Sequence, residues 1–192
     1  MAHLAKSSAH VELPDKRLLK RPHLAILLGL VASEWANLEN TLSFLYATLL
    51  GKYLPHNQRQ GPPIHPIGLQ IFETLENLNK RTQLLQKLSD TLITNESLIL
   101  EMKKDLIPKI KKAGSLRATL VHAFWGINDT EYPDALLLVK APGKFLVYEE
   151  SDFNNTIDFI MATENAIYKF ESKVRQHLRA ARRPYREGFS GS

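Results

Sequence analysis

The chain has 192 residues, a length that suits one domain with tails, and its composition is 44% apolar and 23% charged. It contains no cysteine, which excludes a disulfide framework, thiolate catalysis and cysteine-ligated zinc or iron–sulfur centres. The longest apolar run, residues 24–32, has nine residues, far fewer than the about 20 that span a bilayer. The N-terminal sequence shows no secretory signal pattern, so we expect a cytoplasmic protein with no membrane partner.

The net charge is +5, and the excess lies near the C-terminus. Residues 173–186 include six basic side chains and no acidic one. Without these six charges the net charge of the rest of the chain is 5 − 6 = −1. Clustered arginines attract phosphate backbones without reading sequence. We therefore expect nucleic-acid binding by four of them, Arg175, Arg179, Arg182 and Arg183. The alternative is a solvated helix end whose arginines suit the helix dipole.

The first half of the chain is expected to be helical after a flexible arm, residues 1–21, that has no periodicity. Apolar residues recur at steps of four and three over residues 24–49, which predicts one long helix ended by Gly51. The proline-rich residues 52–66 predict a loop. His56 and His65 share this loop without a carboxylate between them, and we expect no metal site and no cofactor.

Three more helices and one hairpin are predicted. The second helix fits residues 67–92, and the third runs from about Asn95 to Trp125, with a kink or a fresh first turn at Pro108. The period then changes, and two apolar runs around Pro142-Gly143, residues 135–139 and 145–148, predict a short β-hairpin. The fourth helix starts at Asn154 or Asn155 and is stopped by Pro184.

The predicted fold class is all-α, a four-helix up-down bundle with a small β-hairpin between the third and fourth long helices. Residues 22–184 would form a single domain, and residues 185–192 a flexible tail. Trp35 and Trp125 are expected to anchor the core or an interface rather than to stack on bases. The chain has no dinucleotide-binding glycine fingerprint, no Walker loop and no Gly-x-Ser-x-Gly elbow.

One constellation suits phosphodiester chemistry. Arg117 and His122 lie five residues apart, which on a helix is about 140° around the axis and about 7.5 Å along it. They flank an apolar stripe that includes Phe124, and a long arginine can bend around that stripe. A histidine can take the proton of an RNA 2′-hydroxyl, and an arginine can hold two phosphate oxygens. Two such helices meeting across a twofold axis would bring two pairs into one cleft.

Arg117-x4-His122, at the end of a long helix and followed by Trp125-Gly126, resembles the R-x4–6-H signature of the HEPN domain family. Trp35-x-x-Leu38-Glu39 also resembles helices that precede this signature, and the coarse resemblance covers about residues 24–180. The family comprises small all-α bundles, and many members are dimeric, metal-independent ribonucleases of toxin and defence systems. The resemblance implies Arg117 as phosphate clamp and His122 as acid or base. Supporting roles are expected for Glu39, or else Glu34, and for Thr119.

The resemblance implies a homodimer that cleaves or binds RNA in a bacterial stress or defence setting, by transesterification through the RNA 2′-hydroxyl. A cognate antitoxin or a regulatory protein is a further expected partner. Catalytic family members usually have a polar residue directly after the arginine, where this chain has Ala118. Ala118 favours the alternative function, a catalytically inactive dimeric bundle that acts as an interaction or regulatory module.

Overall fold

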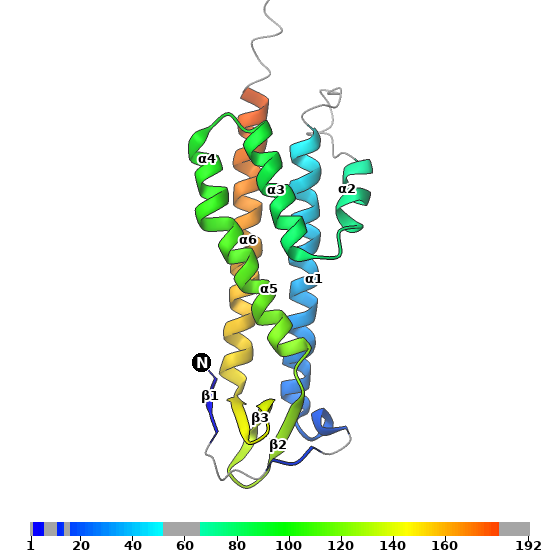
Figure 1. The fold of residues 1–192 in the computed structure, drawn as a ribbon, viewed down its shortest axis with the longest axis vertical. Helices are drawn as coiled ribbons and strands as arrows, with labels where there is room; N and C mark the ends of the chain where they lie inside the picture. The colour runs from blue at the N-terminus through cyan, green and yellow to red at the C-terminus, as the bar shows by residue number, and fades with distance from the viewer. Residues whose placement is uncertain (1, 6–10, 14–15, 52–65, 181–192) are drawn as a thin grey trace, which may run out of the picture. The chain divides into compact units, whose positions relative to one another are not determined.

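The computed structural model describes residues 2–5, 11–13, 16–51 and 66–180 (Figure 1). It is predominantly helical with one small antiparallel sheet, which confirms the helical character that the sequence predicts. The chain divides into two compact units, unit 1 (Met1–Ala36 and Ala113–Met161) and unit 2 (Asn37–Lys112 and Ala162–Ser192). Residues 22–184, predicted as a single domain, are thus divided between the two units. No helix in the described ranges has the length and apolar character needed to cross a membrane.

Three long helices contribute residues to both units. These are α1 (Pro22–Leu50), α5 (Ile107–Val121) and α6 (Glu150–Ala180). The helix predicted over residues 24–49 is confirmed as α1, which begins with a proline at its first position and ends one residue before Gly51. Residues 52–65, where the sequence predicts a loop with His56 and His65, lie outside the described residues, as do residues 181–192.

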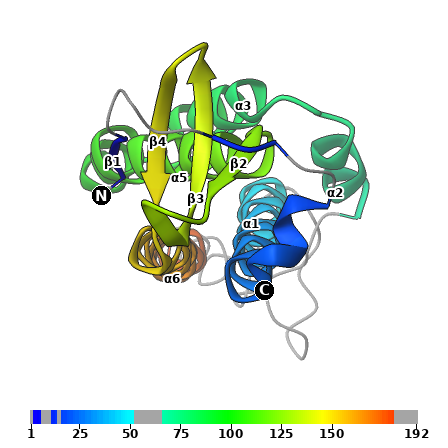
Figure 2. The same ribbon diagram turned by 90° about the horizontal axis from the view of Figure 1, so that it is seen from below.

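Unit 1 contains a four-stranded antiparallel sheet in the order β1-β4-β3-β2, seen from below in Figure 2. Its strands are β1 (His3–Leu4), β2 (Trp125–Asn128), β3 (Tyr132–Ala141) and β4 (Lys144–Tyr148). The predicted hairpin is confirmed as β3 and β4, joined by Pro142-Gly143, where Gly143 has the left-handed φ of 71° that such turns require. The hairpin is not isolated, because β1 pairs with β4 and β2 pairs with β3.

Described residues of the segment predicted as a flexible arm take part in this sheet. His3 pairs with Val147, and Glu12 exchanges two backbone hydrogen bonds with Ile127, at 2.9 and 3.0 Å. The segment then forms a 3₁₀ helix, η1 (Arg17–Lys20), directly before α1. The edges of a sheet present unpaired backbone groups that a short segment of any sequence can satisfy, so side-chain periodicity does not reveal such pairing.

A close approach of the N-terminal segment explains Gly126. A Cβ at this position would collide with the Val11 side chain and would lie 3.2 Å from the carbonyl oxygen of Glu12. Glycine therefore lets residues 11–13 lie directly against β2. On the sheet itself, Val11 packs against the buried cluster formed by Ala135, Leu137 and Val147.

The prediction that the third helix continues to Trp125 is wrong. In the structure α5 ends at Val121, and Trp125 and Gly126 begin strand β2. The Val139 N–H donates to the carbonyl of Phe124 at 3.0 Å, and Trp125 pairs with Leu138. Hydrogen bonds to a neighbouring strand thus override the helical rhythm of the apolar residues, a tertiary effect that local propensity does not contain.

The last helix begins earlier than predicted. α6 starts at Glu150 rather than at Asn154 or Asn155. The Asp152 carboxylate accepts a hydrogen bond from the Glu149 N–H at 3.1 Å, which satisfies a backbone donor just before the helix. This is the side-chain-to-backbone half of a capping box, and it allows the helix to begin at Glu150.

The elements of unit 2 in the described residues are helices. Besides its parts of α1, α5 and α6 it contains α2 (Pro66–Glu73), α3 (Leu78–Leu92), α4 (Glu96–Glu101) and the π-helix η3 (Met102–Leu106). The single helix predicted over residues 67–92 is broken between α2 and α3. The reason is Asn77, whose side chain accepts from the Asn79 N–H at 2.8 Å and caps a new helix. Asn95 caps α4 in the same way, as the sequence indicated.

Pro108, where the sequence predicts a kink or a fresh first turn, is the second residue of α5, and the helical backbone runs into it directly from the π-helix η3. The turn just before it is wide, since the Ile107 N–H donates to the carbonyl of Met102, five residues back. In a regular α-helix a proline lacks the N–H that should donate and its ring clashes with the carbonyl four residues back. The π-helical turn lies where that clash would arise.

Within unit 2, α1 and α6 run parallel. The Thr41 hydroxyl donates to Glu164 at 3.0 Å and the Thr48 hydroxyl donates to Glu171 at 2.6 Å. From the first pair to the second, the residue number rises by seven on both helices. The colours of α1 and α6 therefore run from the N-terminal to the C-terminal end in the same direction in Figure 1. An up-down-up-down bundle has antiparallel first and last helices. The observed directions therefore differ from the predicted ones, since the break at Asn77 adds a helix to the series.

Candidate functional site

The structure brings together the two residues that the sequence predicted as a pair. Arg117 lies in the last turn of α5, and His122 directly follows the helix. The Arg117 Nη1 and His122 Nε2 atoms are 3.1 Å apart. The His122 N–H donates to the Ala118 carbonyl at 3.2 Å, so the backbone continues the helical turn by one residue. This additional helical hydrogen bond brings the imidazole within reach of the guanidinium.

The direction of this hydrogen bond defines the state of the imidazole. A guanidinium has only donors, so in this hydrogen bond the Nε2 atom of His122 can only be the acceptor. An imidazole in this form has a lone pair on Nε2 that can accept a proton, which a general base requires.

The pair is accessible to a ligand. His122 is exposed, and Arg117 is half-buried, with an Nε atom that is buried and has no hydrogen-bond partner among the described residues. A guanidinium has five N–H donors, and the bond to His122 uses one of them. An anion at this position would therefore meet several donors and one proton acceptor together.

An aromatic cluster holds the backbone that follows His122. The Trp125 ring lies 5.4 Å from the Tyr148 ring, edge to face, and 5.8 Å from the Phe153 ring of α6, measured between centroids. Trp125 is 3% exposed, which confirms its expected role in the core. Burial raises the pKa of Tyr148, and the negative charge of Asp152 adds to this effect. Edge-to-face packing of this kind orients the start of β2, three residues after His122.

Two other predicted residues of the motif region lie beside the pair in sequence. Thr119 is half-buried in the last turn of α5, and Ala118 is exposed. Glu34 is half-buried on the unit 1 part of α1.

Glu39 has a different partner from the predicted one. It lies in unit 2, where the Arg81 Nη1 donates to its carboxylate at 2.6 Å. The Arg81 guanidinium also lies over the Phe72 ring, 5.3 Å from its centroid. The predicted support of Arg117 by Glu39 has no counterpart in these contacts.

The basic segment is partly paired. Arg175 of α6 forms an ion pair with Glu171, and Lys173 forms one with Glu101 at 2.8 Å. Arg179 is exposed, and Arg182 and Arg183 lie outside the described residues. Of the predicted nucleic-acid-binding residues within the described ranges, Arg179 is the one without an ion pair to another described residue.

Three exposed residues of unit 1 that follow the pair in the chain were missed by the sequence reasoning. Phe124, which the helical pattern counted in the apolar stripe, is 50% exposed. Lys140 and Lys144 are exposed at the end of the predicted hairpin. The sequence pattern predicted the turn between the two lysines. It did not predict that Phe124 lies beside Val139, because that contact comes from a backbone hydrogen bond between segments far apart in the pattern.

Comparison with known proteins adds no relative. The chain matches no protein-family model, and comparisons with curated proteins and with solved structures gave no match. In the described part of the chain, no group of three or more His, Cys, Asp or Glu side chains could hold a metal ion. The function of this chain therefore has to be inferred from the chemistry of the site itself.

Proposed function

We propose that this chain is a HEPN-like, metal-independent endoribonuclease or RNA-binding protein of a bacterial stress or defence system, and that it adopts a HEPN-like helical bundle. Arg117 and His122 are its active-site residues. The observation that supports this proposal most directly is the 3.1 Å contact between an exposed imidazole and a guanidinium. A proton acceptor and a phosphate-binding donor side by side are the two groups that RNA transesterification needs.

Catalysis begins when a phosphodiester takes the place of His122 on Arg117, because charge-assisted hydrogen bonds to phosphate are stronger than those to a neutral imidazole. The Nε2 atom then accepts the proton of the ribose 2′-hydroxyl, and the 2′-oxygen attacks phosphorus. The bond between phosphorus and the 5′-oxygen breaks, and that oxygen takes a proton from an imidazolium. The products are a 2′,3′-cyclic phosphate and a 5′-hydroxyl, while Arg117 stabilises the charge on the transition state.

A second copy of the chain would complete this arrangement. In a homodimer two imidazoles could share the work, one accepting the 2′-proton and the other donating to the leaving oxygen. The substrate is RNA, because the attacking oxygen is the 2′-hydroxyl that DNA lacks. Basic residues of the C-terminal segment, Arg179 with Arg182 and Arg183, would attract the backbone at long range.

The test is cleavage of a single-stranded RNA by the purified protein in excess chelator. Arg117→Ala and His122→Ala are expected to lower the rate by about 100-fold or more, the usual contribution of such groups. His23→Ala, which removes another exposed histidine of unit 1, is the matched control. Cleavage at the same rate by wild type, Arg117→Ala and His122→Ala would show that the activity belongs to another protein or another site.

Ala118 favours a second candidate, a catalytically inactive dimer that acts as an interaction or regulatory module. The Ala118 side chain is exposed directly after Arg117, and its methyl group cannot bind phosphate. This candidate predicts an RNA gel shift without cleavage, or no shift at low salt if the partner is a protein. A toxin neutralised by an antitoxin predicts instead that expression slows growth and that His122→Ala relieves the effect.

A further inference from the structure

The beginning of α1, in unit 1, has no charged residue on any side. Residues 22–33 contain no Asp, Glu, Lys or Arg, although 23% of the chain is charged. One side packs in the core, where Leu24 and Val31 are fully buried. A surface helix normally has charged and polar side chains opposite the core, whereas a helix that is apolar all round is covered on every side. Residues 22–33 thus have the composition of a covered helix.

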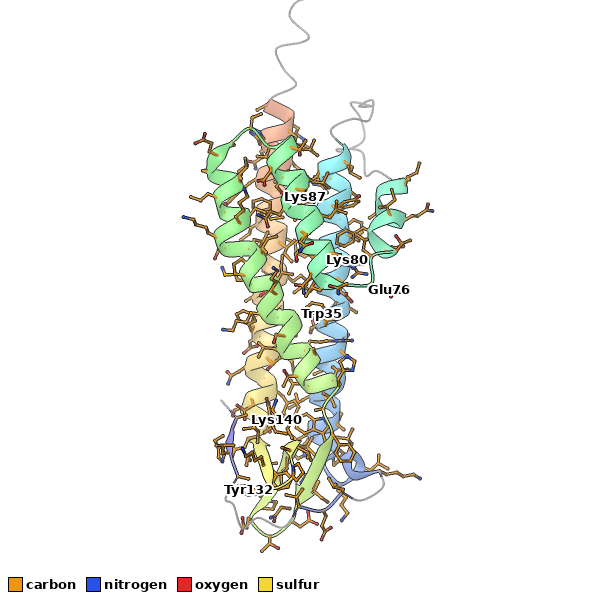
Figure 3. All side chains as sticks on the ribbon, in the orientation of Figure 1. Trp35, Glu76, Lys80, Lys87, Tyr132 and Lys140 are labelled. Carbon is orange, nitrogen blue, oxygen red and sulfur yellow. The ribbon has the colours of Figure 1, made fainter. Side chains whose placement is uncertain are left out.

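The opposite side of this segment is nevertheless exposed. Ile26 is 66% exposed, and Leu30, one turn later, is 42% exposed. Trp35, labelled on α1 in Figure 3, is buried and follows Ile26 by nine residues, which is about 180° around a helix axis. Ile26 and Leu30 therefore point away from the core. We call the exposed residues on this side the exposed α1 face: Pro22, His23, Ile26, Gly29, Leu30 and Ser33.

Gly29 lies in the middle of the exposed α1 face. A Cβ at this position would have no atom within 4 Å, so no contact within the chain requires glycine here. Glycine in the interior of a helix is less favourable than alanine. Because it has no Cβ, it also lets another backbone approach the helix closely. Gly29 therefore suits a position where another molecule packs against α1.

The absence of charge favours a second copy of this chain as that molecule. A contact across a twofold axis joins the same patch of both copies, so charged residues in the patch lie near like charges. The chain has a net charge of +5, and the exposed α1 face lets two copies meet without such repulsion. A different protein would be selected by complementary charges, and residues 22–33 offer no Asp, Glu, Lys or Arg for this purpose.

We propose that the exposed α1 face is a self-association surface, on which α1 of a second copy packs with the closest backbone approach at Gly29. The large side chains of each copy, Ile26 and Leu30, then lie against the small residues of the other, Gly29 and Ser33. The proposed function invokes a homodimer but assigns it no surface. The contact is independent of RNA chemistry, and only its use in catalysis rests on the proposed function.

Analytical ultracentrifugation of the full-length protein over a concentration series tests this surface. Wild type is expected to be dimeric at micromolar concentrations. Ile26→Glu places one carboxylate from each copy in the contact, and burial of two unpaired charges is expected to weaken association about 100-fold or more. The matched control is Ile67→Glu on α2 of unit 2, where the isoleucine is 59% exposed. This control should keep the wild-type dissociation constant.

Two further sets of variants test the geometry of the contact. Gly29→Gln introduces an uncharged residue that is a better helix former than glycine. The separated chain should become more stable while association weakens about tenfold, because the longer side chain prevents the close approach. Leu30→Glu and Leu30→Lys should each be monomeric, whereas their equimolar mixture should form a heterodimer, because opposite charges then meet across the contact. Circular dichroism of every variant establishes that it is folded.

Several results would overturn the surface. They are a monomeric wild type, equal weakening by Ile26→Glu and Ile67→Glu, or no heterodimer in the mixture of the two Leu30 variants. A further one is a monomeric wild type that binds phosphatidylglycerol vesicles through Ile26, because the face would then contact lipid. Failure of the proposed function looks different. In that case Arg117→Ala and His122→Ala do not change RNA cleavage, while self-association and its loss in Ile26→Glu persist.

Discussion

The Nη2 atom of Arg21 donates to the Oδ1 atom of Asp129 at 2.6 Å and ties the residue before α1 to the turn after β2. The Arg21 side chain is 10% exposed, whereas that of Asp129 is 54% exposed. A buried guanidinium needs a counter-charge, because an unpaired charge inside a protein is costly. This ion pair thus holds together two segments that are 108 residues apart, next to the turn that leads into β3, and Lys20 forms a second one with Asp129 at 3.7 Å.

The Arg21–Asp129 pair predicts a loss of stability at acid pH. The hydrogen bond from Arg21 lowers the pKa of Asp129, and the charges of Arg21 and Lys20 act in the same direction. The folded protein therefore binds this proton less tightly than the unfolded chain. The stabilisation is present above the unfolded pKa of about 3.9 and is lost as the pH falls through the lower folded value.

Urea unfolding across a pH series checks this prediction. Asp129→Asn is expected to be less stable than wild type at pH 7, and the difference should shrink as the pH falls from about 5 to about 2. A difference that stays constant over this range would mean that the pair contributes no titrating stabilisation.

Gly126→Ala is expected to lower the free energy of unfolding by about 1–3 kcal/mol, as overpacking usually does. The added methyl group would collide with Val11 and press on the Glu12 carbonyl, which moves the N-terminal segment off β2. Chemical denaturation measures the loss, and Val11→Ala in the same chain should recover part of it. Wild-type stability of Gly126→Ala would show that residues 11–13 do not pack on β2.

Gly29→Ala is the matched control for that substitution. A Cβ at this exposed position of α1 has no atom within 4 Å. Alanine is the better helix former, so this variant is expected to be more stable than wild type by about 0.5–1 kcal/mol. The same chemical change thus has opposite signs at two glycines of unit 1.

Glu39→Gln is expected to affect stability rather than catalysis. The Glu39 and Arg81 side chains are 36% and 14% exposed, and a double-mutant cycle with Arg81→Met should give a coupling of about 1 kcal/mol. RNA cleavage by folded Glu39→Gln should equal that of wild type. A lost cleavage rate at unchanged stability would instead support the sequence-based expectation that Glu39 acts through Arg117.

Ala118→Asn is expected to raise RNA cleavage or RNA affinity roughly tenfold, the effect of one added hydrogen bond to a charged group. The position is exposed and directly follows Arg117, so an amide there can reach a bound phosphate. Ala36→Asn, at an exposed position of α1 in unit 1, controls for the helix-propensity cost of asparagine. No gain from Ala118→Asn alone would favour the inactive-module candidate.

Local signals in the sequence accounted for the elements whose cause is local. The steps of four and three before Gly51 predicted α1, Pro142-Gly143 predicted the hairpin, and Asn95 predicted the start of α4, because caps, turns and helical faces depend on neighbouring residues. The chain positions of Arg117 and His122 at a helix end were likewise visible. Their contact also depends on the hydrogen bond from the His122 N–H to the Ala118 carbonyl, which extends the helical backbone to His122.

The sequence by itself determined that this chain is mostly helical, lacks cysteine chemistry and has an arginine and a histidine five residues apart at a helix end. Only the tertiary structure decided that α5 stops at Val121 and that residues from the N-terminus join the sheet. It also decided that Phe124 stays exposed beside Val139. The physical reason is that hydrogen bonds between strands join residues far apart in the chain, and their free energy outweighs the local helical preference of the segment from Ala123 to Gly126.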